Sequence, residues 1–268
     1  MENSEKDIEI LEMVYKALEE DRVKVFYQPQ FNAKTCRLES AEALCRIVND
    51  YNEMIMPGDF IPVLEKQESP DAIRNFDWYI FTQVCRFLGK LRKNHMRPIP
   101  ISVNLSRRHL LSNPTELYLE NTAKELSIPH RLLDVEITES AVEEDPMELQ
   151  RLIYKIRSQG FRVAIDDFGA GQSNFKFLID NQVDIIKLDQ SFIARKCKDP
   201  RERAVLGALI NLAKHDLGMT VVAEGVEDPE QWEFLKDQGC DLIQGFLFSE
   251  PLCADDFISF YHGCTEDI

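Results

Sequence analysis

Carboxylate and amide side chains recur at the ends of eight short apolar runs in this sequence. The runs are VKVFYQP, LESAEAL, ISVNLS, LDVEITE, VAIDDFG, VDIIKLD, VVAEGVE and LIQGFLF. Their polar residues are Gln28, Glu42, Asn104, Glu136, Glu139, Asp166, Asp167, Lys187, Asp189, Glu224, Glu227 and Gln244. Carboxylates that recur at strand ends do not contribute to an apolar core. Their recurrence therefore predicts one site that collects cations.

The spacing of the runs predicts the architecture that gathers these groups. From the third run onward, most strand candidates are followed by an amphipathic helical stretch and then by the next strand, which is typical of a parallel α/β fold. Eight units favour a closed (β/α)8 barrel, in which strand ends converge on one face although they are far apart in sequence. A doubly wound open sheet is the rival. It would leave most of the carboxylates far apart.

Helix boundary signals support this count of units. Residues 145–160 begin with Asp-Pro and end in glycine, and residues 228–239 repeat this arrangement, as expected for a capped helix with proline in its first turn. Between residues 46 and 98 the chain is expected to form two helices, GDFIPVLEK and one opened by Ser69-Pro70. This crossover is longer than a minimal barrel needs.

The chain divides into a helical lead-in, residues 1–22, and a barrel domain, residues 23–268. The lead-in places four apolar residues at helical spacing, which are Ile8, Leu11, Tyr15 and Leu18. We expect this face to pack on the closed end of the barrel or to lead in from elsewhere. At 268 residues and 44% hydrophobic, the chain can bury the core of a single domain.

Composition predicts a cytoplasmic protein without a zinc centre. No apolar stretch approaches the roughly 20 residues of a membrane helix, and the start MENSEKDIE lacks the basic and apolar regions of a signal peptide. Seven cysteines without a CxxC pair indicate reduced thiols in a reducing compartment. The five histidines form no HxH or HExxH pattern.

Net charge limits the kinds of ligand. With 31 Lys and Arg against 47 Asp and Glu, the net charge is −16, and such a protein repels long nucleic acids. A small phosphorylated ligand is compatible with this charge if divalent cations lie between its phosphate and the carboxylates.

Seven motifs, in order, resemble those of the EAL domain family and together span about residues 26–251. They are EALCR, SVNLS, VEITES, DDFGAGQS, IKLD, AEGVE and QGFLFSEP. The resemblance implies a modified TIM (β/α)8 barrel whose first strand is antiparallel. It also implies a cyclic di-GMP phosphodiesterase that uses two Mg²⁺ or Mn²⁺ ions to cut the ring to linear pGpG, which lowers a bacterial second messenger.

The motifs match the metal ligands of the family to residues of this chain. The residues matched to one metal are Glu42, Asn104, Glu136 and Asp166. Asp166 would bridge to a second metal that also takes Asp167, and Glu224 has been assigned in the family both to the metal site and to general-base work. Two divalent cations about 4 Å apart can neutralise a phosphate and activate a water. Asp166 and Asp167 can share a site only if the chain bends at DFG, which the glycines of FGAG allow.

The remaining roles also follow from the resemblance. Lys187 matches a lysine beside the attacking water, where it either lowers the water's pKa or stabilises negative charge in the transition state. Glu139 resembles the residue that braces the loop after strand five, GAGQSN. The residues matched to ligand contact are Gln28, Arg46, Asp189, Glu227 and Gln244. Arg46 suits a phosphate, while Glu227, next to Asp228, could instead serve the start of a helix.

Other motifs and functions fit these residues less well. GAGQSN imitates a dinucleotide fingerprint, but Asn174 replaces its third glycine. The DFG motif lacks the HRD catalytic loop of kinases. Gln172 and Ile47 stand where the family usually has aromatic residues. The runner-up function is a degenerate EAL-type receptor that binds cyclic di-GMP or a protein partner without cutting anything, and a remoter one is a phosphatase or nuclease on another phosphodiester.

The resemblance also bears on partners. Family members often pair through the loop and helix after strand five, which is compatible with a homodimer. An upstream sensor or cyclase domain is compatible with a chain that starts almost where the family domain starts.

Overall fold

The strands form a closed ring in this computed structural model, which describes residues 2–67, 69, 71–106, 108, 114–138, 146–170, 175–194 and 200–266. Within these residues the ring has eight strands: β1 (Val23–Asn32), β2 (Leu38–Val48), β4 (Ile101–Asn104), β5 (Leu133–Thr138), β6 (Arg162–Phe168), β7 (Ile185–Leu188), β8 (Thr220–Ala223) and β9 (Leu242–Ile243). β1 is antiparallel to β2 and β9, and the other neighbours are parallel. The modified barrel is confirmed, and the open sheet was the wrong alternative.

The β1–β2 hairpin is longer than the other strand pairs. Gln28 lies directly opposite Glu42 in its register, so both residues stand within strands and not at their ends. Two short strands that sequence patterns did not predict extend the sheet: β3 (Met54–Ile55) pairs with β2, and β10 (Leu252–Cys253) pairs with β1.

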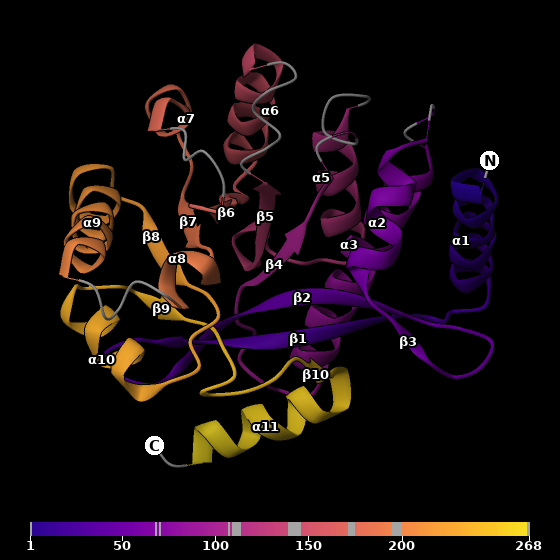
Figure 1. Cartoon of the computed structure of the whole chain (residues 1–268). Coiled ribbons are helices and arrows are strands. Elements are labelled where there is room, and N and C mark those ends of the chain that lie inside the picture. Colours follow the sequence, from indigo (N-terminus) through magenta and orange to yellow (C-terminus); the bar gives the residue numbers. More distant parts are fainter. Residues whose placement is uncertain are drawn as a thin grey trace.

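Helices surround the barrel (Figure 1). The long crossover between β2 and β4 contains the two expected helices, α2 (Pro57–Glu65) and α3 (Asp71–Lys93). The others described are α1 (Glu2–Glu19), α5 (Thr115–Glu125), α6 (Pro146–Ser158), α7 (Phe175–Asp180), α8 (Gln190–Ala194), α9 (Pro200–Asn211), α10 (Pro229–Asp237) and α11 (Ala254–Glu266), with a 3-10 turn at His130–Leu132 and a π turn at Leu212–Asp216. None of the described helices is long and apolar enough to cross a membrane.

The inside of the barrel has an apolar layer below a polar one. Four neighbouring strands contribute a small buried apolar cluster, which consists of Ala164, Ile185, Val222 and Leu242. Two positions further along the chain stand Asp166 and Lys187, within β6 and β7, and Glu224 and Gln244, directly after β8 and β9. Because side chains alternate between the two faces of a strand, these polar groups point to the same side as the apolar cluster. The alternation therefore places the polar groups above an apolar floor.

Helix α1 packs on α2 at the flank of the barrel (Figure 1), with Val14 and Ala17 fully buried. The expected apolar face was wrong in part, because Ile8 and Tyr15 are 52% and 44% exposed. Val14 and Ala17 thus lie on the buried face of the helix, while Ile8 and Tyr15 face solvent.

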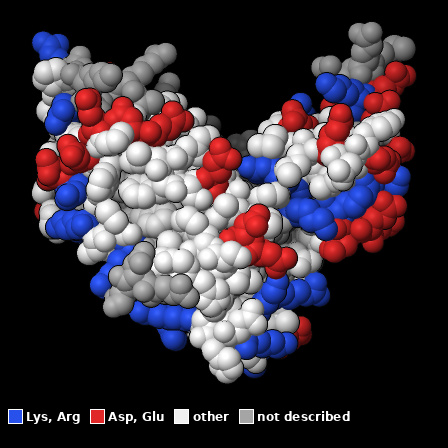
Figure 2. All heavy atoms as spheres, turned by 90° about the horizontal axis from the view of Figure 1, so that it is seen from below, with Lys and Arg blue, Asp and Glu red and all other residues white. Residues whose placement is uncertain are grey.

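Charged side chains of both signs share the face seen from below (Figure 2). Among the described residues of that face, Lys and Arg form small groups beside Asp and Glu around broad uncharged areas.

Candidate active site

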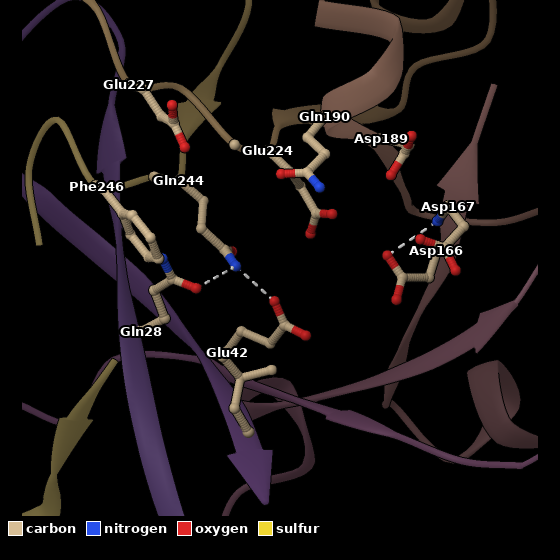
Figure 3. Close-up of a pocket in the computed structure, with 13 residues that line it drawn as sticks. Gln28, Glu42, Asp166, Asp167, Asp189, Gln190, Glu224, Glu227, Gln244 and Phe246 are labelled. Carbon is tan, nitrogen blue, oxygen red and sulfur yellow. Dashed lines mark hydrogen bonds between the residues drawn. The ribbon is translucent and has the colours of Figure 1, made fainter. Parts of the chain in front are cut away.

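A cavity of about 360 Å³ opens above the apolar floor, at the carboxyl ends of the parallel strands (Figure 3). Its walls are formed by Gln28, Glu42, Leu44, Asp166, Asp167, Asp189, Gln190, Glu224, Gly225, Glu227, Gln244, Gly245 and Phe246. Eight of these were candidates from the sequence. The barrel therefore brings together side chains that lie far apart in the chain.

Lys187 lies at the centre of the buried acidic groups and is 1% exposed. Its ammonium Nζ is within salt-bridge distance of four carboxylates, which are Glu224 (2.7 Å), Glu136 (2.9 Å), Asp166 (3.0 Å) and Glu42 (3.2 Å). Four carboxylates against one ammonium leave an excess of three negative charges when all are ionised. Burial alone would lower the pKa of Lys187, but these carboxylates raise it well above its ordinary value.

The carboxyl groups around Lys187 differ in how far and in which direction their pKa values are shifted. Burial, reinforced by the neighbouring Glu42 charge, raises the pKa of Glu136 well above its ordinary value. Burial raises the pKa of Glu224 to about 8 even though Lys187 opposes this shift. Glu42 is different: burial acts to raise its pKa, but Lys187 and the Gln244 amide hold the pKa below its usual range. These shifts reflect an excess of negative charge in a buried space.

The chain bends at Asp167, which brings two consecutive aspartates to one site. Asp167 has a φ of 58°, and the pairing of β6 with β7 shifts register between Ile165 and Phe168. Its backbone N–H donates to Asp166 Oδ1 at 3.0 Å. The expected bend at DFG is present, because Gly169 of the same motif also has a positive φ, 101°. Burial, Asp166 and Asp189 raise the pKa of Asp167 to about 6.

Two overlapping groups of acids could each hold a cation. The first group consists of Glu42, Glu136 and Asp166, and the second consists of Asp166, Asp167 and Glu224. Within each group the ligand oxygens lie within 4.8 Å of one another. Asp166 belongs to both groups. Asn104 donates its amide to Glu42 Oε1 at 3.1 Å, which places it beside the first group. Glu136 Oε1 is buried and accepts no hydrogen bond of ordinary geometry within the described part of the chain. The donor set and the surplus of negative charge fit hard divalent cations.

The expected ligand-contact residues divide between the cavity and its surroundings. Asp189 and Glu227 line the cavity. Asp189 Oδ1 also accepts a hydrogen bond from the N–H of Ser191 at 2.9 Å. Asp228, and not Glu227, caps α10, so the Glu227 carboxylate is not used at the helix start. Arg46 is not among the described residues of the cavity wall, and its guanidinium donates to the Cys45 carbonyl at 2.7 Å. Glu139 lies outside the described residues.

Sequence reasoning missed three side chains of the cavity wall, which are Leu44, Gln190 and Phe246. Figure 3 labels the last two. Gln190 packs over Gly225, where an added Cβ would lie 2.2 Å from the Gln190 Cβ, so only glycine allows this approach. Phe246 is 61% exposed. Gln190 directly follows Asp189, and Phe246 lies two residues after Gln244, so their positions in the motifs could have indicated these two residues.

A β/α barrel with one antiparallel strand and an acidic cavity at its carboxyl ends defines the class of modified TIM barrels. Within that class, the family model for the EAL domain matches residues 11–251, and the chain belongs to the EAL domain family.

Known relatives agree with this assignment. The chain is 35% identical to the oxygen sensor protein DosP of Escherichia coli over 90% of its length and 30% of DosP. It is 34% identical to the cyclic di-GMP phosphodiesterase PdeR of Escherichia coli, over 92% of this chain and 36% of PdeR. The structure of the PaMucR phosphodiesterase in complex with c-di-GMP superposes with a TM-score of 0.85 at 28% identity, covering 93% of this chain and 99% of that one. The chain thus spans about a third of the length of these curated relatives.

Proposed function

We propose that this protein hydrolyses cyclic di-GMP to linear pGpG in a reaction that depends on Mg²⁺ or Mn²⁺, with two ions per site. The observation that carries the proposal is the pair of acidic groups that share Asp166. The PdeR relative and the PaMucR complex support the choice of substrate.

The metal ligands in this proposal are Glu42, Asn104, Glu136, Asp166, Asp167 and Glu224. Bound divalent cations would neutralise the phosphate and supply a water that is nucleophilic at neutral pH. Asp166, as the member of both groups, would be a ligand in each of them. A buried acidic cavity of this kind would exclude a bare phosphodiester, so the ligands serve binding as well as chemistry.

The other side chains bind and orient the substrate. Lys187, a donor at the centre of the acids, holds the carboxylates in place and stabilises negative charge that develops at the phosphate. Asp189 and Glu227 offer acceptor oxygens on the cavity wall, which suit the N–H donors on the edge of a guanine base. Gln28 and Gln244 complete the wall on the side of Glu227, across from Asp189 (Figure 3).

The test is turnover of cyclic di-GMP with Mn²⁺, with Mg²⁺ and with chelator, with linear product resolved by chromatography. Metal-dependent appearance of pGpG supports the proposal. Binding of cyclic di-GMP that leaves the ligand unchanged with either metal would overturn it and would identify a receptor.

A further inference from the structure

Gln30 and Ser40 lie behind the cavity and form no part of its wall. They stand directly opposite each other in the β1–β2 hairpin, one register step beyond the pair Pro29 and Ala41. Both are buried, with exposures of 4% and 3%. A buried amide or hydroxyl needs a hydrogen-bonding partner, and here the partners lead to the active site.

A chain of short hydrogen bonds runs from this pair to Glu42. The Ser40 hydroxyl donates to Gln30 Oε1 at 2.6 Å, and Gln30 Nε2 donates to Gln244 Oε1 at 2.7 Å. Gln244 Nε2 then donates to Glu42 Oε2 at 2.6 Å. Its second N–H reaches Gln28 Oε1 at 3.1 Å, so both protons of the Gln244 amide are used.

The direction of this chain is fixed by its last member. A carboxylate only accepts hydrogen bonds, so Gln244 must turn its NH₂ group toward Glu42 and its carbonyl oxygen toward Gln30. Gln30 must therefore present its own NH₂ group to Gln244. Its oxygen faces Ser40, whose hydroxyl donates. Successive hydrogen bonds that all run in the same donor-to-acceptor direction strengthen one another in a buried space.

We propose that Gln30, held by Ser40, is a positioning residue that sets the rotation of the Glu42 carboxylate through Gln244. With Oε2 held by Gln244, Oε1 of Glu42 faces Asn104 at 3.1 Å, on the side of the first acidic group. Both residues are ligands of one metal in the proposed function, and this inference rests on that role for its effect on metal binding. Gln30 itself belongs to neither acidic group and not to the cavity wall.

Two substitutions separate positioning from space filling. Gln30→Met keeps the volume of the side chain and removes its hydrogen bonds, so Gln244 Oε1 loses the hydrogen bond from Gln30 while its NH₂ group keeps Glu42 and Gln28. Gln30→Glu keeps the shape but presents acceptors only, and it draws the NH₂ group of Gln244 to itself. The Gln244 oxygen then faces the Glu42 carboxylate, and the two groups repel each other.

The deciding experiment is titration calorimetry of Mn²⁺ binding to the full chain and to its variants. We expect affinity to fall about 10-fold in Gln30→Met and about 100-fold in Gln30→Glu, the range seen when groups behind metal ligands are changed, with a smaller loss in Ser40→Ala. Tyr261→Phe, which removes a buried hydroxyl bonded to the Arg97 carbonyl far from the cavity, should bind Mn²⁺ normally. Equal losses in Gln30→Met and Gln30→Glu, or wild-type affinity in folded Gln30→Glu, would overturn the proposal.

A crystal structure of metal-free Gln30→Glu gives a readout that needs neither metal nor substrate. The Gln244–Glu42 contact, 2.6 Å in the wild type, should open beyond hydrogen-bonding distance. A preserved contact would contradict the proposed polarity. Hydrolysis is measured separately: a wild-type protein that binds Mn²⁺ but leaves cyclic di-GMP intact overturns the proposed function, whereas the order of Mn²⁺ affinities decides the role of Gln30.

Discussion

Lys187 Nζ lies 2.7 Å from Glu224 Oε1, and this contact is the shortest of the four that the ammonium makes with carboxylates. Glu224 follows the end of β8, while Lys187 lies on the neighbouring strand β7. The ammonium thus joins the second acidic group to the first. Since burying like charges without compensation is costly, Lys187 is central to the stability of the site when no metal is bound.

Lys187→Met should abolish hydrolysis and destabilise the metal-free protein in a pH-dependent way. The variant keeps the apolar stem but leaves the carboxylates without a cation, which costs about 3–5 kcal/mol for a broken buried pair. At lower pH the acids take up protons and repel one another less. Urea unfolding in chelator at pH 8 and pH 6 should therefore show the larger loss at pH 8. Equal losses at both pH values would argue against this account.

The metal-free wild type should lose stability as pH rises above neutrality. Burial raises the pKa of Glu224 to about 8 and that of Asp167 to about 6, whereas carboxyls in unfolded chains titrate near pH 4. The folded state therefore holds these protons more tightly, and the stability they contribute is lost as pH rises from about 4 through about 8. The unfolding temperature in chelator should be lower at pH 8.5 than at pH 6. Mg²⁺ should raise it more at pH 8.5, because the ion replaces protons. An equal rise at both values would contradict the assignment.

Glu42→Ala and Asp167→Asn should each reduce hydrolysis by at least about 100-fold while the barrel stays folded, because each removes a proposed metal ligand. Circular dichroism and thermal unfolding check the fold, and product chromatography measures turnover. Glu9→Ala, which changes an exposed acid of α1, is the control and should match the wild type. Retained turnover in both site variants would refute the metal assignment.

Much of the fold could be predicted because it depends on local patterns. Proline and glycine signals marked α6 and α10, and apolar runs marked the strands of the barrel. The orientation of α1 could not be predicted from periodicity alone. Its exposed residues Ile8 and Tyr15 and its buried Val14 and Ala17 are all consistent with an apolar helix, and only packing against α2 decides between the faces.

The candidate site was predictable to the extent that its residues end strands. The bend at Asp167 depends on a positive φ that the sequence permits but does not specify. Gln30 could not be predicted, because the sequence of a strand does not show which residue a polar side chain within it contacts. Its role follows only from the contact with Gln244. Such long-range contacts belong to tertiary structure.

Phe246→Ala should weaken substrate binding more than the chemical step. Phe246 is 61% exposed on the cavity wall, next to Gln244 and across from Gln190 (Figure 3). An exposed ring at a cavity offers a stacking surface for a base, and such stacking contributes about 1–3 kcal/mol. KM for cyclic di-GMP should therefore rise about 10-fold or more, with kcat changed less than about 3-fold.

Two controls define what this result means. Tyr154→Ala removes an aromatic side chain that is 74% exposed on α6, outside the cavity wall, and should leave KM unchanged. Mn²⁺ affinity should also be normal in Phe246→Ala, because the ring is not a metal ligand. A fall in kcat with unchanged KM would show that Phe246 acts on the reaction itself and not on binding of the base.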